Sequence, residues 1–194
     1  MNITERQFEI ITAAGKILTR SGIHGLTIKN LAKEMKFSES AVYRHFSSKE
    51  EIIVGMLNYL AENMEQRFKV AANENNSPED NFKALFESQL SFFNQYPHFS
   101  VAVFSDGQFE ESKKINQSIA KIMQVKMKYL MPFVLQGQKE GDFTQSVTTE
   151  DLIHVVMGSI RLLMYKWRSS NFEFDIIRYG KNMIETNLTL IKNK

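Results

Sequence analysis

Cationic, hydroxyl and phenol side chains gather between residues 27 and 49, in the segment TIKNLAKEMKFSESAVYRHFSSK. Such groups bind the phosphates of double-stranded DNA, and an arginine can also make two hydrogen bonds to the edge of a guanine. The predicted phosphate contacts are Tyr43, Lys49 and Thr27, which are a phenol, a cation near a helix start and a capping hydroxyl. These side chains therefore favour recognition of DNA.

Four residues after Ser38 are candidates for contacts with base edges: Glu39, Ser40, Ala41 and Arg44. Two hydrogen bonds from Arg44 to a guanine would discriminate between base pairs by about 1–3 kcal/mol. Glu39 would accept a hydrogen bond from a cytosine amine, or instead repel phosphates and narrow the set of tolerated sites. The alternative is that Arg44 and Glu39 are ordinary solvated surface charges.

Two further side chains extend this predicted surface. Lys29 would reach the DNA backbone or a base edge, and His45 would donate to a phosphate, more strongly when protonated. The complete set of predicted DNA contacts is Thr27, Lys29, Ser38, Glu39, Ser40, Ala41, Tyr43, Arg44, His45 and Lys49.

Two short helices joined by a tight turn must position these groups. Thr27 can cap the first helix, whose apolar face has helical spacing: Ile28, Leu31, Ala32 and Met35. Ser38 can cap the second helix, in which Val42 and Phe46 point inward. A helix this short is unstable alone in water, so a scaffold must present its outer face. The pattern predicts a helix-turn-helix.

The first quarter of the chain resembles the DNA-binding domain of the TetR family of bacterial transcriptional regulators. The resemblance rests on residues whose spacings agree together: Ile10, Ala13, Ala14, Gly22, Thr27, Leu31, Ala32, Ser38, Val42, Tyr43, His45, Phe46, Ser48, Lys49 and Glu50. The chain departs from the family pattern at Lys36, where a turn glycine is usual, and at Glu39, where many relatives have a neutral or basic residue. A lysine is disfavoured at a position that needs a positive φ.

The resemblance implies a homodimer that binds a palindromic operator through two recognition helices and dimerises through its last helices. It also implies that a small effector releases the DNA. The predicted domains are a helix-turn-helix domain at residues 1–48 and an effector-binding and dimerisation domain at residues 49–194.

Composition is consistent with an all-α fold. The chain has 194 residues, three prolines and nine glycines, and helix formers are abundant. Its net charge is +2, but residues 1–50 hold eight Lys and Arg against five Asp and Glu. The absence of cysteine fits a reducing compartment, and no apolar run is long enough to span a bilayer. We therefore expect a cytoplasmic protein.

Apolar periodicity predicts the remaining helices. The predicted spans are 4–19, 48–72, 78–95, a short helix in HFSVAVFSDG, 110–139, 150–169 and 175–192. The last two helices are apolar on two faces, so both faces must be covered. Gly158 and Gly180 would allow close helix approach. We expect these helices to form a four-helix bundle with a second copy; the alternative is burial within one subunit.

Aromatic and methionine side chains in residues 49–194 are candidates for an effector cavity, because methionine repacks around different ligands. The predicted lining residues are Phe86, Phe93, Tyr96, Phe104, Met123, Met127, His154, Met157 and Tyr165. This composition favours an apolar or aromatic effector, although side chains at helical spacing also belong in a core.

Enzyme hypotheses have little support in the sequence. The four histidines are scattered, and there is no glycine-rich phosphate loop. Asp151 and His154 share a helix face, but a di-iron site needs further inward carboxylates. We predict no catalytic residue, metal or cofactor. The alternative function is an all-α small-molecule carrier or metal-dependent enzyme in which the helix-turn-helix is only structural.

Overall fold

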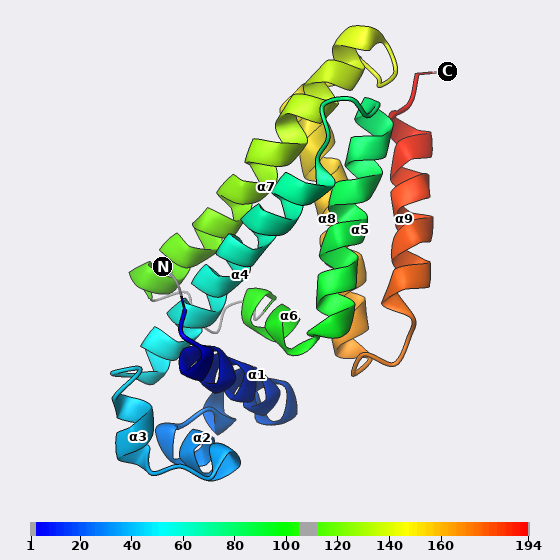
Figure 1. The fold of residues 1–194 in the computed structure, drawn as a ribbon. Helices are drawn as coiled ribbons and strands as arrows, with labels where there is room; N and C mark the ends of the chain where they lie inside the picture. The colour runs from blue at the N-terminus through cyan, green and yellow to red at the C-terminus, as the bar shows by residue number, and fades with distance from the viewer. Residues whose placement is uncertain (1–2, 105–111, 194) are drawn as a thin grey trace. The chain divides into compact units, whose positions relative to one another are not determined.

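The computed structural model describes residues 3–104 and 112–193. These residues form nine α-helices and one isolated β-bridge, between Phe143 and Lys192, so the predicted all-α fold is confirmed for this part of the chain (Figure 1). The helices are α1 (Glu5–Gly25), α2 (Ile28–Met35), α3 (Glu39–Tyr43), α4 (Lys49–Ala71), α5 (Pro78–Gln95), α6 (His98–Val103), α7 (Lys113–Glu140), α8 (Thr149–Ser169) and α9 (Ile176–Ile191).

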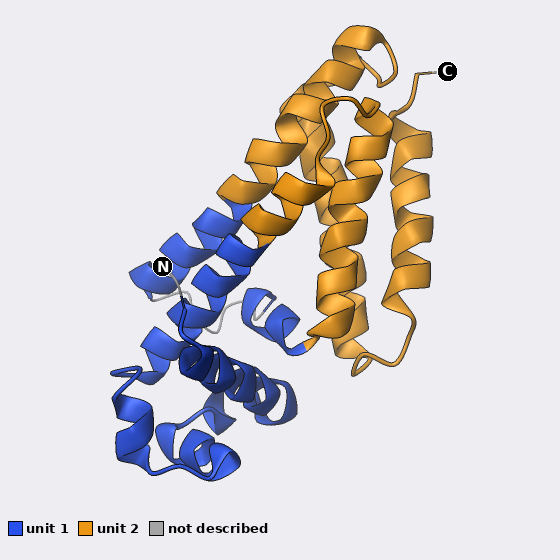
Figure 2. Cartoon of the chain, in the orientation of Figure 1, with its two compact units in different colours: residues 1–63, 98–123 blue, residues 64–97, 124–194 orange. Residues whose placement is uncertain are grey.

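The chain divides into two compact units (Figure 2). Unit 1 comprises residues 1–63 and 98–123, and unit 2 comprises residues 64–97 and 124–194. The long helices α4 and α7 each run from one unit into the other. The predicted DNA-binding domain, residues 1–48, lies entirely within unit 1, which also contains α6.

Unit 1 has an apolar core built around α1. Ile10, Ile11 and Ala14 are fully buried. The helix begins with a capping box, in which the Thr4 side chain and the Gln7 side chain each accept from the other's backbone N–H. The predicted end of α1 at residue 19 was too early, because helical structure extends to Gly25, with a kink at Gly22, whose φ of 62° and ψ of −168° are not helical.

Unit 2 packs α5 closely against α9. A Cβ added at Gly180 of α9 would lie 2.3 Å from Leu90 Cδ1 of α5, so the predicted close approach at this glycine is confirmed. The α8–α9 contact includes a buried polar link, in which the Asn187 amide donates to Ser159 Oγ at 2.8 Å. At Gly158 the described chain offers no neighbour within 4 Å of an added Cβ, so this glycine makes no close approach within the chain.

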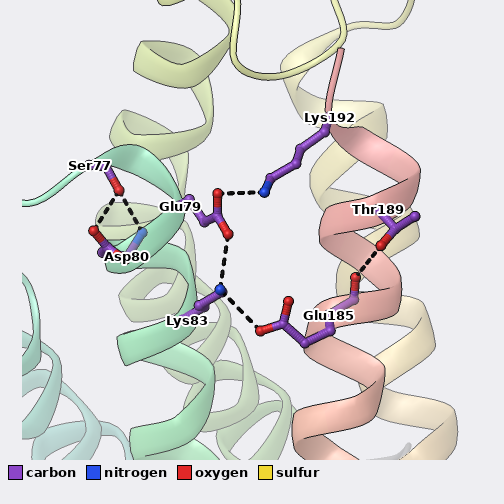
Figure 3. Close-up of polar contacts among 7 residues, drawn as sticks. All are labelled: Ser77, Glu79, Asp80, Lys83, Glu185, Thr189 and Lys192. Atoms are coloured by element: carbon purple, nitrogen blue, oxygen red, sulfur yellow. Dashed lines mark hydrogen bonds and ion pairs between the residues drawn. The ribbon is translucent and has the colours of Figure 1, made fainter. Parts of the chain in front are cut away.

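A charged network joins the start of α5 to the end of α9 (Figure 3). The Glu79 carboxylate pairs with Lys83 at 2.9 Å and with Lys192 at 2.6 Å, and Lys83 also pairs with Glu185 at 3.1 Å. Hydrogen bonds from Lys192 and Lys83 lower the pKa of Glu79. The network therefore adds charge pairing to an interface that apolar side chains already hold together.

Candidate DNA-binding interface and effector cavity

Helix α2 is fixed by its cap and by its apolar face. The Thr27 hydroxyl accepts from the Asn30 backbone N–H at 3.1 Å, as predicted for a capping residue. Leu31 and Ala32 are buried against α1 and α3 of unit 1. Lys29 is exposed on the opposite side of the helix, where a side chain is available to DNA.

Lys36 adopts the left-handed conformation in the turn between α2 and α3, with φ 56° and ψ 40°. Its N–H donates to the Lys33 carbonyl at 3.2 Å, and the Phe37 N–H donates to the Ala32 carbonyl at 2.8 Å. These two bonds form a Schellman motif, whose left-handed position usually holds a glycine. The turn therefore needs the positive φ that disfavours a lysine.

Helix α3 is anchored at both ends. The Ser38 hydroxyl caps its start by accepting from the Ala41 N–H at 3.2 Å, and Ser40 Oγ lies 2.9 Å from Ser38 Oγ. Val42 is fully buried and Phe46, just beyond the helix, is 5% exposed. The inward pair predicted from the spacing is thus in place, and Glu39, Ser40 and Tyr43 of α3 are exposed.

The predicted DNA contacts mostly lie on the surface of this helix pair. Exposed residues among them are Thr27, Lys29, Ser38, Glu39, Ser40, Tyr43 and Arg44. Ala41, His45 and Lys49 are half-buried. Lys49 has a structural partner, because its ammonium donates to the Ile23 carbonyl at 2.7 Å, and partial burial lowers its pKa. Two of its three N–H donors are left for a phosphate, so its contact with DNA stays a prediction.

Helix α6 packs against α1 within unit 1. A Cβ added at Gly15 would lie 2.6 Å from Cδ2 of the buried His98 ring, so the two helices touch there. Burial, and secondarily the positive charge of Lys16, lower the pKa of His98 to about 4. The Tyr59 ring of α4 stacks on Phe99 of α6 at 5.4 Å. Helix α1, against which α2 packs, therefore rests on a close contact with α6 in which His98 is neutral at pH 7.

Unit 2 contains a narrow cavity among α4, α5, α7 and α8, lined by Phe68, Leu85, Phe86, Gln89, Lys126, Leu130 and Met157. Its free volume is about 10 Å³, room for about one water. An effector must therefore displace some of the lining side chains. Two of the predicted effector contacts, Phe86 and Met157, line this cavity, and their contact with an effector stays a prediction.

The other predicted effector contacts do not line this cavity. Buried ones are Phe93 and Phe104, and half-buried ones are Tyr96 and Met127. Met123, His154 and Tyr165 are exposed, so none of them belongs to the core of the described chain, and their contact with an effector stays a prediction. Helical spacing placed these side chains on apolar faces but did not identify the face that packs within the chain.

Two family descriptions match the chain. Residues 10–56 match bacterial regulatory proteins of the tetR family. Residues 55–190, more than half of the chain, match the C-terminal region of YsiA-like protein. The chain belongs to the TetR family of bacterial regulatory proteins.

The chain is similar to two proteins of Bacillus subtilis (strain 168). An uncharacterized HTH-type transcriptional regulator, YuxN, is 24% identical over 189 residues, which cover 93% of this chain and 64% of that protein. The chain thus spans less than two thirds of the length of YuxN. A fatty acid metabolism regulator protein is 17% identical over 190 residues, which cover 97% of each chain.

A solved structure has the same fold along nearly the whole chain. It is the transcriptional regulator FadR from Bacillus subtilis in complex with stearoyl-CoA, with a TM-score of 0.80 and 16% identity. The alignment covers 94% of this chain and 97% of FadR.

Two exposed cations near the TetR-type helix pair, Lys36 and Arg6, were not among the DNA contacts predicted from the sequence. The Lys36 side chain is exposed in the turn, although the sequence drew attention only to its backbone. Arg6, at the start of α1, lies 5.0 Å over the Phe37 ring and pairs with Glu9. The separation of Arg6 and Phe37 along the sequence gave no indication that they would meet.

The structure gives Asp151 a capping role in α8, where its carboxylate accepts from the Thr148 hydroxyl at 2.7 Å. Within residues 3–104 and 112–193, no three His, Cys, Asp or Glu side chains are grouped to hold a metal ion. In the same part of the chain, no helix combines the length and apolar character needed to cross a bilayer.

Proposed function

We propose that this chain is a homodimeric, ligand-responsive repressor of transcription, which binds a palindromic operator and leaves it when a small effector binds. The observation that carries this proposal is the capped α2–turn–α3 arrangement, whose outward face holds Tyr43, Arg44 and Lys29. Residues 1–48, together with Lys49 at the start of α4, supply the DNA contacts, and residues 49–194 supply effector binding and dimerisation. A protein that binds the chromosome of a bacterium would act in the cytoplasm. We assign this chain the binding of DNA and an effector, and no catalysed reaction.

Exposed apolar stripes on α8 and α9 support the dimer. On α8, Val155, Leu162 and Tyr165 are exposed, and they share one face with the open Gly158. On α9, Tyr179 and Leu190 are exposed on one face, at 52% and 70%. Both stripes lie in unit 2, and water contact of such side chains is unfavourable. A second copy, pairing the same two helices about a two-fold axis, would cover them.

The effector we propose is an amphipathic fatty acyl compound. The support is the apolar lining of the cavity and the FadR relative that binds stearoyl-CoA. Unit 2 would open around the acyl chain, because Met157 and Phe86 line the cavity and methionine adapts its shape readily. The effector acts only to the extent that it prefers one arrangement of the dimer over the other.

Along the chain, α6 connects the effector-binding helix α5 to the contact with α1. This helix follows α5 directly after Tyr96 and Pro97, and it packs on α1 at Gly15. Movement at the end of α5 would thus be passed to the helix that carries the DNA-binding pair. Helices α4 and α7 supply a second path, because each continues from unit 2 into unit 1.

The DNA-binding half of this proposal is tested by fluorescence anisotropy with a duplex from upstream of the chain's own gene, with a scrambled duplex as control. We expect tighter binding to the upstream duplex. Affinity should fall about 10³-fold or more between 50 and 200 mM salt, if about six or more phosphates are contacted. Equal, salt-insensitive binding of both duplexes would contradict DNA recognition and favour a carrier.

A further inference from the structure

Lys36 holds a strained backbone conformation in the turn between α2 and α3. Its φ of 56° and ψ of 40° are left-handed, which is unfavourable for a lysine. Backbone strain of this kind is concentrated at functional sites. The Lys36 side chain is exposed, and Ser38, which caps α3, follows two residues later. An exposed cation is thus carried by the turn that leads directly into the predicted recognition helix.

The first turn of α1 brings a second cation to this turn. The Arg6 guanidinium lies 5.0 Å over the ring of Phe37, the residue that follows Lys36. Stacking on an aromatic ring orients a guanidinium. The neighbouring Gln7 amide donates to the carbonyl of His45, just beyond α3. The first turn of α1 therefore meets the chain both before and after α3.

The charges around Phe37 suit a phosphate. Arg6 donates from Nη1 to the Glu9 carboxylate, but a guanidinium has five N–H donors, and half of this side chain is exposed. The only acidic residue between positions 36 and 49 is Glu39, whose charge would repel the DNA backbone. Two cations gathered around Phe37, two residues before Glu39, would offset that repulsion.

We propose that Lys36 and Arg6 bind the DNA backbone as a pair of phosphate contacts, next to the base pairs that α3 meets. Lys36 would act as a point charge, and Arg6 would donate from the N–H groups that Glu9 does not use. Phosphate contacts position a protein without reading sequence, so the pair would strengthen binding to every duplex. This inference rests on the proposed function, because it adds two residues to the same DNA-binding surface.

The test is fluorescence anisotropy of the full-length chain with the upstream and scrambled duplexes, between about 50 and 200 mM salt. Loss of one phosphate contact lowers the slope of log affinity against log salt concentration by about 0.9. We expect this change for Lys36→Gly and for Arg6→Gln, with affinity about fivefold to tenfold lower at about 100 mM salt and the same loss on both duplexes. Lys36→Arg, which keeps the cation, should retain the wild-type affinity and slope.

Arg20→Gln is the matched control for the loss of one positive charge. Arg20 is an exposed arginine of α1 that pairs with Glu34, as Arg6 pairs with Glu9. It lies about 21 Å along the helix from Arg6, well beyond the distance of about 10 Å over which 0.1 M salt screens a charge. We therefore expect Arg20→Gln to leave the salt slope unchanged.

Stability separates a lost contact from a damaged fold. Lys36→Gly should unfold at a higher urea concentration than the wild-type chain, because glycine adopts a positive φ without strain, and should nevertheless bind DNA less tightly. Wild-type slopes for both Lys36→Gly and Arg6→Gln would overturn the inference, as would an equal loss with Lys36→Arg or with Arg20→Gln. Such results, with salt-sensitive binding of DNA by the wild-type chain, leave the proposed function standing. A wild-type chain that binds neither duplex would contradict both.

Discussion

Lys36 is the residue at which the DNA-binding segment departs most clearly from its family pattern. Its φ of 56° closes the Schellman motif between α2 and α3, and this conformation costs a non-glycine residue about 1–2 kcal/mol. The exposed side chain adds a cation beside α3. The sequence thus accepts backbone strain at a position where the exposed side chain adds positive charge beside the predicted recognition helix.

We therefore expect Lys36→Gly to raise the free energy of unfolding by about 0.5–1 kcal/mol, because glycine adopts a positive φ without strain. Lys33→Gly is the control, since Lys33 is an exposed lysine inside α2 and its replacement should cost about 1 kcal/mol. Urea denaturation followed by circular dichroism measures both. Equal destabilisation by the two changes would show that the left-handed turn is not strained.

Tyr43 and Arg44 are neighbours with different predicted tasks. Tyr43→Ala should weaken binding to all DNA sequences alike, because a phosphate contact carries no sequence information. Arg44→Ala should cost about 1–3 kcal/mol on the preferred operator and relax the choice at one base pair. Anisotropy titrations against operators substituted one base pair at a time measure the difference. An equal loss on every operator with Arg44→Ala would remove its role in reading a base.

At the scale of helices, capping and periodicity predicted most of the fold. Thr27 and Ser38 cap the helices that their positions predicted, and the short α6 is a helix despite a composition that suits a strand. Helix caps and helix formation depend on residues that are close together in the sequence, so they can be predicted from a single sequence. The predicted start at residue 110 of the helix observed as α7 lies outside the described residues.

The candidate effector site was harder to predict from the sequence. Periodicity identifies an apolar face but not the element that covers it. For this reason periodicity assigned His154 and Tyr165 to a pocket, whereas both are exposed in the described chain. Gln89 and Lys126 were not predicted, because polar residues at helical spacing resemble an ordinary solvated face. Only the packing of four helices brings them to one cavity.

The charged network between α5 and α9 gives the helix pair a pH dependence. The pKa of Glu79 is lowered in the folded chain, first by Lys192 and then by Lys83. Its contribution to stability is therefore present above its ordinary pKa of 4.5 and is lost as pH falls through the lower folded value. Because the network is largely exposed, we expect only about 0.5–1 kcal/mol from it.

Glu79→Gln should accordingly lower the free energy of unfolding at pH 7. Its effect should shrink as the pH falls below 4.5 and through the lowered pKa of the folded Glu79 carboxylate, because that carboxylate then becomes protonated. Glu87→Gln, on the same helix but exposed outside the network, is the control and should have little effect at either pH. Urea titrations at the two pH values measure the differences. A Glu79→Gln effect that does not depend on pH would mean that packing, rather than charge, links these groups.

At the scale of the whole molecule, the exposed stripes of α8 and α9 require an explanation. On α8, Leu162 and Val155 are exposed at 55% and 64%, although the opposite face of this helix is buried. The two-faced pattern was predicted from the sequence, and within residues 3–104 and 112–193 the second face of α8 stays exposed. A second copy covers that face in the dimer we propose.

Leu162→Glu should place a charge in this interface and shift the chain toward the 22.5 kDa monomer, because an unpaired buried charge is strongly unfavourable. Thr189→Glu is the control, since Thr189 is exposed on α9 away from the stripe and the charge change is the same. Light scattering at micromolar concentration measures the mass of each. A wild-type mass near that of the monomer would contradict the dimer, and a dimeric Leu162→Glu would place the interface elsewhere.

The most direct test of a ligand-responsive regulator compares the affinity of the wild-type chain for its upstream duplex with and without a saturating acyl effector. Fluorescence anisotropy with dodecanoyl-CoA provides the comparison, and calorimetry establishes that the effector is bound. We predict that the effector lowers DNA affinity by about 5- to 150-fold, the usual range of coupling between sites. An unchanged affinity for DNA while dodecanoyl-CoA occupies the chain would contradict the account.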